Sequence, residues 1–215
     1  MARRNSTYYT RMSDKPESRV DSTNLISPNV CEYIEALQLG SHAIFCYDIK
    51  EEVVQVFNSY LKGGIDRNEA LRLMTPTREV YSDFLQGAGV DPKLLERDGR
   101  LHFLAMRELF ADKGPLNIHR VLQFMQKLAQ EDRDGGFKGT RVISLSEYYL
   151  EYTSPSDLLQ FEREIGRDSN LPLTVTCTYD GRKLLKRGLG ELLLSLFQHH
   201  GRIIGKELVI QNPDD

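Results

Sequence analysis

The chain has few of the features that mark several large classes of protein. Its 215 residues carry a formal net charge of −3, which gives no general attraction to nucleic acid. No segment approaches the roughly 18 consecutive apolar residues of a membrane span, and the polar N-terminus contains no secretory signal. We therefore expect a cytoplasmic protein with no direct contact to membranes or nucleic acid.

Cysteine is scarce, and histidine is poorly placed for metal binding. The three cysteines, Cys31, Cys46 and Cys177, form no C-x-x-C pair, and an odd number does not fit a disulfide framework. We expect them to be buried, reduced thiols. The adjacent His199 and His200 would point about 100° apart on a helix, which makes them poor joint ligands. The sequence therefore predicts no metal site, and no cofactor is expected.

A third absence lies in a strand–turn–helix at residues 43–62. Residues 43–47 predict a buried strand, and residues 51–62 predict an amphipathic helix. In a nucleotide-binding domain the connection would be rich in glycine and would carry a lysine after it, so that backbone N–H groups hold phosphates. Here the connection, residues 48–52, is acidic and lacks glycine. Its carboxylates complement the helix dipole but would repel a phosphate.

A second nucleotide feature is missing from the predicted strand at 140–145. In phosphate-loop ATPases the equivalent strand ends in an aspartate that holds magnesium. Here the first carboxylate after the strand is Glu147. Two missing features together argue against nucleotide hydrolysis, so we expect a protein that is not an enzyme.

Strands and helices alternate along the rest of the chain. Such alternation predicts an α/β fold of three layers, in which a mostly parallel sheet has helices on both faces. We expect a polar, flexible tail over residues 1–26 and a single domain over residues 27–212. The strands are expected at 43–47, 70–74, 101–106, 140–145, 173–179 and 203–210, and the helices at 28–39, 51–62, 77–87, 92–97, 117–131, 155–165 and 182–199.

The carboxyl ends of the strands are where an open α/β sheet binds ligands. Tyrosine and carboxylate side chains follow three of the predicted strands, and they could form an amphipathic pocket at this rim. The alternative is an ordinary solvated sheet edge. The candidate ligand-binding residues are Tyr47, Asp48, Glu147, Tyr179 and Asp180.

Three further residues are secondary candidates. His42 precedes the first strand at the end opposite the rim, and His199 ends the last helix, where a cation complements the helix dipole. Arg141 opens the fourth strand and requires an ion-pair partner, for which Glu164 and Glu191 are candidates.

The order of several short motifs resembles that of the MEDS domain, the sensory domain of methanogen and methylotroph regulators that include the dichloromethane-responsive repressor. The matching segments extend over about residues 28–210. They are Gly40-Ser41-His42 with Tyr47, residues 61–64, 87–91, 99–101 and 136–142, Phe161-Glu162, residues 177–180, and His199 before residues 203–205.

The resemblance implies a RecA/KaiC-like fold whose phosphate loop is lost. It also implies a sensory role in signal transduction or transcription regulation, in archaea or bacteria, with small organic molecules as ligands. Residues 1–26 are too few for a helix-turn-helix. We therefore expect the domain to act through a separate output protein, either a kinase or a transcription regulator, or through a homo-oligomer.

Two other functions stay open. One is a degenerate KaiC-like ATPase subunit that serves as an assembly or interaction protein. It would use a wide apolar face on the last helix, formed by Leu184, Leu185, Leu189, Leu192, Leu193, Leu196 and Phe197. The other is a nucleotide hydrolase with an unusual phosphate site, for which Lys50 and Arg107 are the available cations.

Overall fold

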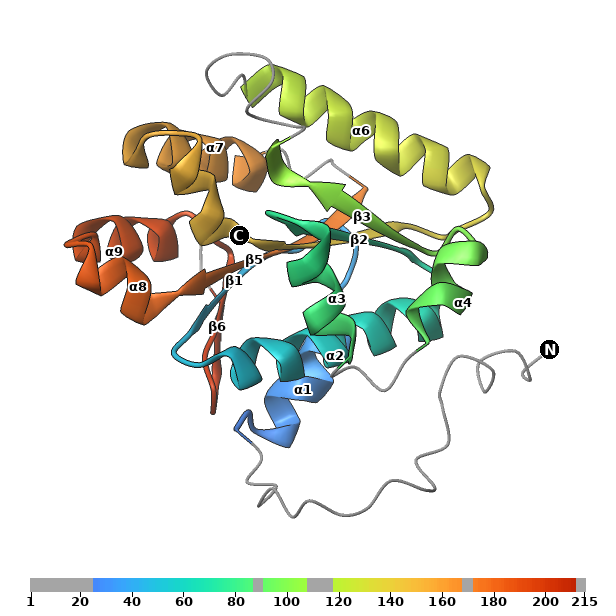
Figure 1. Cartoon of the computed structure of the whole chain (residues 1–215), viewed down its shortest axis with the longest axis horizontal. Helices are drawn as coiled ribbons and strands as arrows, with labels where there is room; N and C mark the ends of the chain where they lie inside the picture. The colour runs from blue at the N-terminus through green and yellow to red at the C-terminus, as the bar shows by residue number, and fades with distance from the viewer. Residues whose placement is uncertain (1–24, 87–90, 108–117, 168–171, 212–215) are drawn as a thin grey trace.

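The computed structural model describes residues 25–86, 91–107, 118–167 and 172–211 as one layered α/β domain (Figure 1). The expected tail at residues 1–26 lies almost entirely outside these ranges. The strands are β1 (His42–Tyr47), β2 (Ala70–Thr75), β3 (Leu101–Ala105), β4 (Thr140–Leu145), β5 (Leu173–Asp180), β6 (Arg202–Ile204) and β7 (Val209–Gln211). The helices are α1 (Pro28–Glu35), α2 (Lys50–Arg67), α3 (Arg78–Gln86), α4 (Pro92–Arg97), α6 (Ile118–Asp134), the 3₁₀ helix η3 (Ser146–Glu151), α7 (Pro155–Arg167), α8 (Gly181–Lys186) and α9 (Gly190–Gln198).

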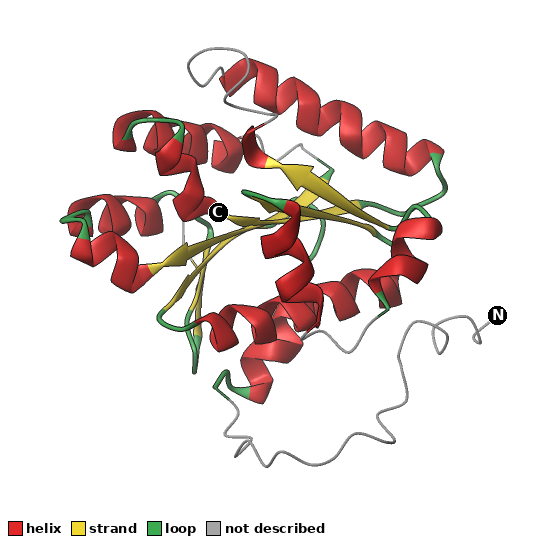
Figure 2. Cartoon of the chain, in the orientation of Figure 1, coloured by secondary structure: helices red, strands yellow, loops and turns green. Residues whose placement is uncertain are grey.

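The sheet confirms the predicted α/β class. Its strand order is β3-β2-β4-β5-β1-β6-β7, and all pairs are parallel except β6 with β7. Helices α1, α2 and α3 cover one face, and α6, α7 and α9 cover the other (Figure 2). β1 and β5 are neighbours whose following helices lie on opposite faces, which is the arrangement that opens a crevice at the carboxyl ends of the strands. None of the described helices is long and apolar enough to cross a bilayer.

The helix predicted at 28–39 is α1, which ends at Glu35. Three other predicted elements differ from the structure in ways that glycine explains. α2 continues past the predicted end at residue 62, because Gly63 and Gly64 serve close packing inside the helix. A Cβ on Gly63 would lie 2.3 Å from the carbonyl oxygen of Glu35 in α1. The predicted helix 182–199 is two helices, because Gly188 has a φ of 72° and ends the first. The predicted strand 203–210 is the hairpin β6–β7, which turns at Gly205.

Buried ion pairs hold the helical layers to the sheet. Arg141 on β4 is fully buried and pairs with Glu69, which precedes β2; Glu164 and Glu191, the partners proposed from the sequence, are not its partners. The Arg141 guanidinium also donates to the carbonyl oxygens of Glu35 (3.1 Å) and Leu37 (2.8 Å) at the end of α1. One side chain thus joins β4, the start of β2 and α1.

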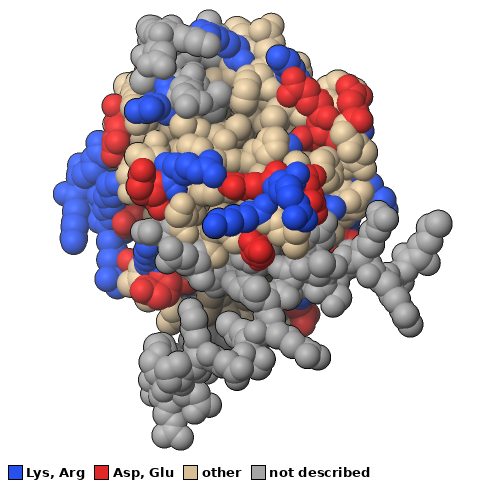
Figure 3. Space-filling view, turned by 45° about the vertical axis from the view of Figure 1, so that its right-hand side comes forward, with Lys and Arg blue, Asp and Glu red and all other residues tan. Residues whose placement is uncertain are grey.

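The opposite face of the sheet carries a similar buried pair. Arg72 on β2 pairs with Asp132 on α6. Thr140 on β4 donates to the other oxygen of Asp132 at 2.7 Å. Charges at the molecular surface are mixed, since acidic and basic side chains alternate across the middle of the face in Figure 3.

The first prediction concerns the Arg141–Glu69 pair. We expect Glu69→Ala to lower the free energy of unfolding by about 3–5 kcal/mol, because it leaves a buried guanidinium without its counter-charge. Lys62→Ala is the matched control. It removes an ion pair to Glu35 from a side chain that is 50% exposed, so it should cost less than about 1 kcal/mol. Urea unfolding of both variants tests this, and equal losses would contradict it.

Candidate functional site

The carboxyl end of β1 and the start of η3 form the centre of the predicted rim site. Tyr47 is the last residue of β1, and its hydroxyl donates to Oε1 of Glu147 at 2.7 Å. Only 7% of Tyr47 and 2% of Glu147 is exposed. Oε2 of Glu147 is buried and has no hydrogen-bond partner among the described residues. The structure thus brings together two predicted residues that lie 100 positions apart in the sequence.

The environment of Glu147 favours its neutral form. Burial raises the pKa of this carboxyl to about 7, although the hydrogen bond from Tyr47 and the charge of Lys183 act in the opposite direction. Burial, followed by the nearby Glu147, also raises the pKa of the Tyr47 phenol. The rim therefore holds a carboxyl group that titrates near neutral pH.

Asp180 and Lys183 lie next to this pair. Asp180 caps α8, because its Oδ1 accepts the backbone N–H of Lys183 at 2.7 Å. The Lys183 ammonium lies 4.0 Å from the ring centroid of Tyr148. Cys46 is also close: a Cβ on Gly181 would lie 2.6 Å from its sulfur. Burial, and then the charges of Asp48 and Asp180, raise the pKa of the Cys46 thiol to about 11.

In the turn before α2, a carboxylate of the chain occupies the position at which a nucleotide-binding fold holds a phosphate. Glu52, in the first turn of α2, accepts the backbone N–H of Asp48 at 2.8 Å and that of Ile49 at 3.4 Å. The other oxygen of Glu52 pairs with Lys206 at 2.7 Å, and Lys206 also pairs with Asp48 at 3.0 Å. Backbone donors that would hold a phosphate therefore hold a carboxylate of the chain itself.

Tyr179 belongs to a different cluster, deeper under α7. Its hydroxyl donates to Oε1 of Glu162, a fully buried residue of α7. The second oxygen of Glu162 lies 3.2 Å from Nε2 of His42 and 3.5 Å from Nε2 of His200. The Cys177 thiol donates to the same oxygen at 3.2 Å. We refer to His42, Glu162, Cys177, Tyr179 and His200 as the Glu162 cluster.

The Glu162 carboxyl is held in its charged form. Burial alone would raise its pKa, but the hydrogen bonds and charges of His200 and His42 keep the pKa well below the usual range. Burial and the neighbouring Glu162 carboxylate raise the pKa of the Cys177 thiol. Among the described residues, His42, Glu162, Cys177 and His200 form the one group of three or more side chains that could hold a metal ion.

The other secondary candidates lie outside both clusters. Arg141 is at the amino end of β4, beneath α1, where its guanidinium makes the ion pair with Glu69 and the hydrogen bonds to α1 described above. His199 follows α9, with its Nε2 3.5 Å from Arg163. Sequence reasoning assigned no role to Glu162 or His200, although Glu162 and Cys177 both lie in motifs that carried the family resemblance.

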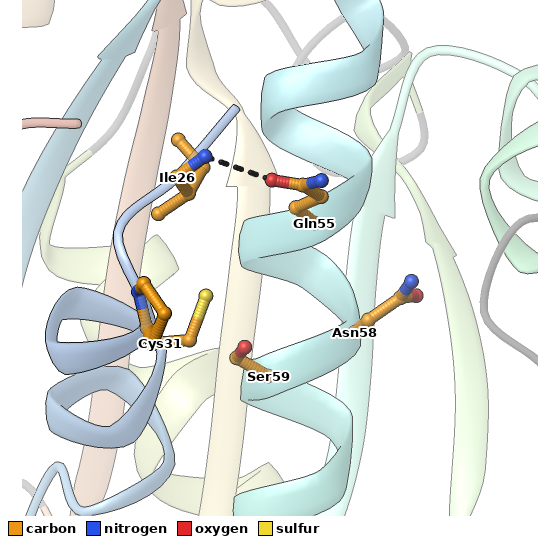
Figure 4. A pocket seen from close by; sticks show the side chains of 6 residues that line it. Ile26, Cys31, Gln55, Asn58 and Ser59 are labelled. Carbon is orange, nitrogen blue, oxygen red and sulfur yellow. Dashed lines mark hydrogen bonds between the residues drawn. The ribbon is translucent and has the colours of Figure 1, made fainter. Parts of the chain in front are cut away.

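A separate hollow lies between helix α2 and the start of α1 with the residues just before it (Figure 4). Ile26 closes one end of it through a hydrogen bond from its backbone N–H to Gln55 at 2.9 Å. Cys31 and Ser59 face each other across it. None of the candidate residues predicted from the sequence lines this hollow.

The strand order and the rim at the β1–β5 boundary define an open, mostly parallel α/β fold in which Glu52 fills the turn after β1. Residues 41–195 match the model of the MEDS family, the methanogen/methylotroph, DcmR sensory domain. The chain belongs to this family, which suggests a sensory or regulatory role.

Solved structures support the KaiC-like fold. An uncharacterized protein from Pyrococcus horikoshii, crystallised with an unknown peptide, is similar with a TM-score of 0.58 and 15% identity, over 78% of this chain and 77% of that one. A KaiC-like protein from Pyrococcus horikoshii OT3 is similar with a TM-score of 0.54 and 13% identity, over 81% of this chain and 76% of that one. No curated protein matches the chain in sequence.

The second prediction uses the raised pKa of Glu147. The folded pKa is about 7 and the ordinary value is 4.5, so the folded protein binds more protons here than the unfolded chain between these pH values. The stability that this group contributes is therefore complete below pH 4.5 and is lost as the pH rises through 7. We expect the stability of the wild type relative to Glu147→Gln to fall by up to about 3 kcal/mol between pH 4.5 and 8.

Urea unfolding of both proteins across this pH range measures the difference, in which contributions from other titrating groups cancel. A difference that does not change with pH would contradict the prediction.

Proposed function

We propose that this chain is a non-catalytic sensory domain that binds a small organic cation at the rim formed by Tyr47, Glu147 and Asp180. The observation that carries this proposal is the unsatisfied oxygen of Glu147 in the described part of the chain. A buried carboxylate oxygen without a donor is costly, and a ligand with an ammonium group would provide both a donor and a counter-charge.

The surrounding residues support a small ligand with an apolar part. The ring of Tyr47 offers apolar contact next to its polar hydroxyl. Asp180 adds negative charge near Glu147. Asp48 forms an ion pair with Lys206 at the outer edge of the rim. In this proposal Asp48 therefore stabilises the rim and does not contact the ligand.

The lack of catalysis is proposed on the same geometry. Because Glu52 accepts the N–H groups of Asp48 and Ile49 just before α2, a phosphate in this turn would have to displace a carboxylate that is itself paired with Lys206. The sensory domain then acts through a separate output protein or through self-association.

The third prediction tests ligand binding by thermal shift at pH 8. Methyl- to butylammonium ions should raise the Tm of the wild type, whereas the alcohols of equal size and ATP with Mg²⁺ should not. Glu147→Gln should abolish the shift, because it removes the counter-charge. Tyr47→Phe should weaken it, because Glu147 loses its orienting hydrogen bond.

Glu151→Gln, which removes an exposed carboxylate from the same short helix, is the matched control and should keep the full shift. Equal shifts in Glu147→Gln and Glu151→Gln would overturn the proposed site. A shift with ATP that phosphate release accompanies would overturn the non-catalytic role.

An assembly role is the second candidate, and two leucines favour it. Most of the apolar face predicted on the last helix is buried, including Leu184 and Leu196. Leu185 on α8 and Leu194 on α9, however, are 60% and 65% exposed. Exposed leucines on adjacent helices suit a partner helix or a second copy of the chain.

The fourth prediction tests this role. Light scattering of the purified chain is expected to give a dimer or larger assembly, and the double change Leu185→Ser/Leu194→Ser is expected to give a monomer. Leu39→Ser, at a leucine that is 43% exposed near α1, is the control and should leave the assembly intact. A wild-type monomer that co-purifies with no other protein would remove the assembly role.

A further inference from the structure

Four side chains of the Glu162 cluster that could ligate a metal ion come from four separate parts of the chain. His42 begins β1, Glu162 lies on α7, Cys177 lies in β5, and His200 follows α9. One donor atom from each lies within 4.8 Å of all the others. The exposed fraction is 7% for His42 and at most 1% for the other three.

Four of the six distances between the donor atoms match those around a tetrahedral ion. Ligand bonds of about 2.0–2.3 Å around zinc place neighbouring donors about 3.2–3.8 Å apart. Oε2 of Glu162 lies 3.2 Å from Nε2 of His42, 3.2 Å from the sulfur of Cys177 and 3.5 Å from Nε2 of His200. The sulfur of Cys177 lies 3.5 Å from Nε2 of His42.

The tautomer of His200 points to a positive charge at the centre of the cluster. Its Nδ1 lies 2.7 Å from the carbonyl oxygen of Leu196, and because a carbonyl only accepts, Nδ1 carries the proton. Nε2 makes no hydrogen bond of standard geometry, and it lies 3.5 Å from Oε2 of the Glu162 carboxylate. In a neutral ring this places a lone pair against a negatively charged oxygen, so the contact requires a positive charge, which either a second proton on the ring or a bound cation supplies.

The charge balance supports the same conclusion. A divalent cation together with the Glu162 carboxylate and a Cys177 thiolate would leave the buried cluster with no net charge. On binding, Cys177 would release its proton to solvent. Two nitrogen donors, one sulfur and one oxygen suit Zn²⁺, whereas Mg²⁺ and Ca²⁺ prefer oxygen ligands alone.

We propose that His42, Glu162, Cys177 and His200 form a closed, four-coordinate site for Zn²⁺ or an ion of the same class. The site would tie β1 and β5 to α7 and to the end of α9. Tyr179 would act as a positioning residue, because its hydroxyl holds the free oxygen of Glu162. The carbonyl oxygen of Leu196 would orient His200 in the same way.

The test uses the full chain purified from zinc-supplemented cells. Elemental analysis is expected to give about one zinc per chain. After chelation, titration with Co²⁺ is expected to give the visible bands of a tetrahedral site and a near-ultraviolet band from the cobalt–thiolate bond. Cys177→Ser should remove the near-ultraviolet band.

Two further variants compare the contribution of a ligand with that of a positioning residue to zinc affinity. His200→Gln should lower zinc affinity more than about 10-fold, and Tyr179→Phe, which keeps all four ligands, should lower it about 10-fold. His102→Gln on β3 and Cys31→Ser beside α2 are matched controls that should bind as the wild type does. Circular dichroism checks that each variant is folded.

The proposal is overturned if the wild type contains no zinc and its metal-free form shows neither a cobalt band nor a rise in Tm with zinc. A near-ultraviolet band unchanged in Cys177→Ser would also overturn the assigned ligands. Neither result bears on amine binding at Glu147, which is measured at a different cluster.

Discussion

A sheet covered by helices on both faces leaves no water to solvate a charge at its centre, and this constraint organises the whole domain. Every large charged side chain between the layers therefore needs a partner inside the protein. Arg141 meets Glu69 and the carbonyl oxygens of α1 on one face, and Arg72 meets Asp132 on the other. These pairs fix the helical layers in position, and the strand ends that carry the candidate site are positioned through them.

The same constraint explains the acidic turn after β1. The first N–H groups of a helix need acceptors, and in nucleotide-binding relatives of this fold a phosphate supplies them. Here Glu52 accepts the N–H groups of Asp48 and Ile49 just before α2, and Lys206 neutralises its charge. The turn after β1 is therefore held by an acceptor and a counter-charge that both belong to the chain itself.

Much of the fold could be predicted from the sequence, because buried parallel strands are short apolar runs separated by helical patterns. Errors in the predicted helix bounds occurred at glycines, because a glycine can either allow close packing inside a helix or end it. Gly63 and Gly64 allow close helix packing, whereas Gly188 ends a helix. The proximity of Tyr47 and Glu147 could be predicted from the sequence, because both residues lie at the carboxyl ends of strands on one rim. Glu162 and His200 were not, because their meeting depends on how α7 and α9 pack over β5, which no local pattern encodes.

The two clusters differ from a nucleotide-binding site in the same way, because they present acceptors where such a site presents donors. A nucleotide-binding rim presents donors and lysine to an anion. In this chain Glu52 occupies two donors just before α2. The two clusters present acceptors instead: a carboxylate oxygen of Glu147 at the rim, and the carboxylate and imidazole nitrogens around Glu162 beneath α7. β5 connects them, since it carries Cys177 in one cluster and Asp180 beside the other. Both clusters thus present buried acceptor atoms, and this shared property is why a cation is proposed for each of them.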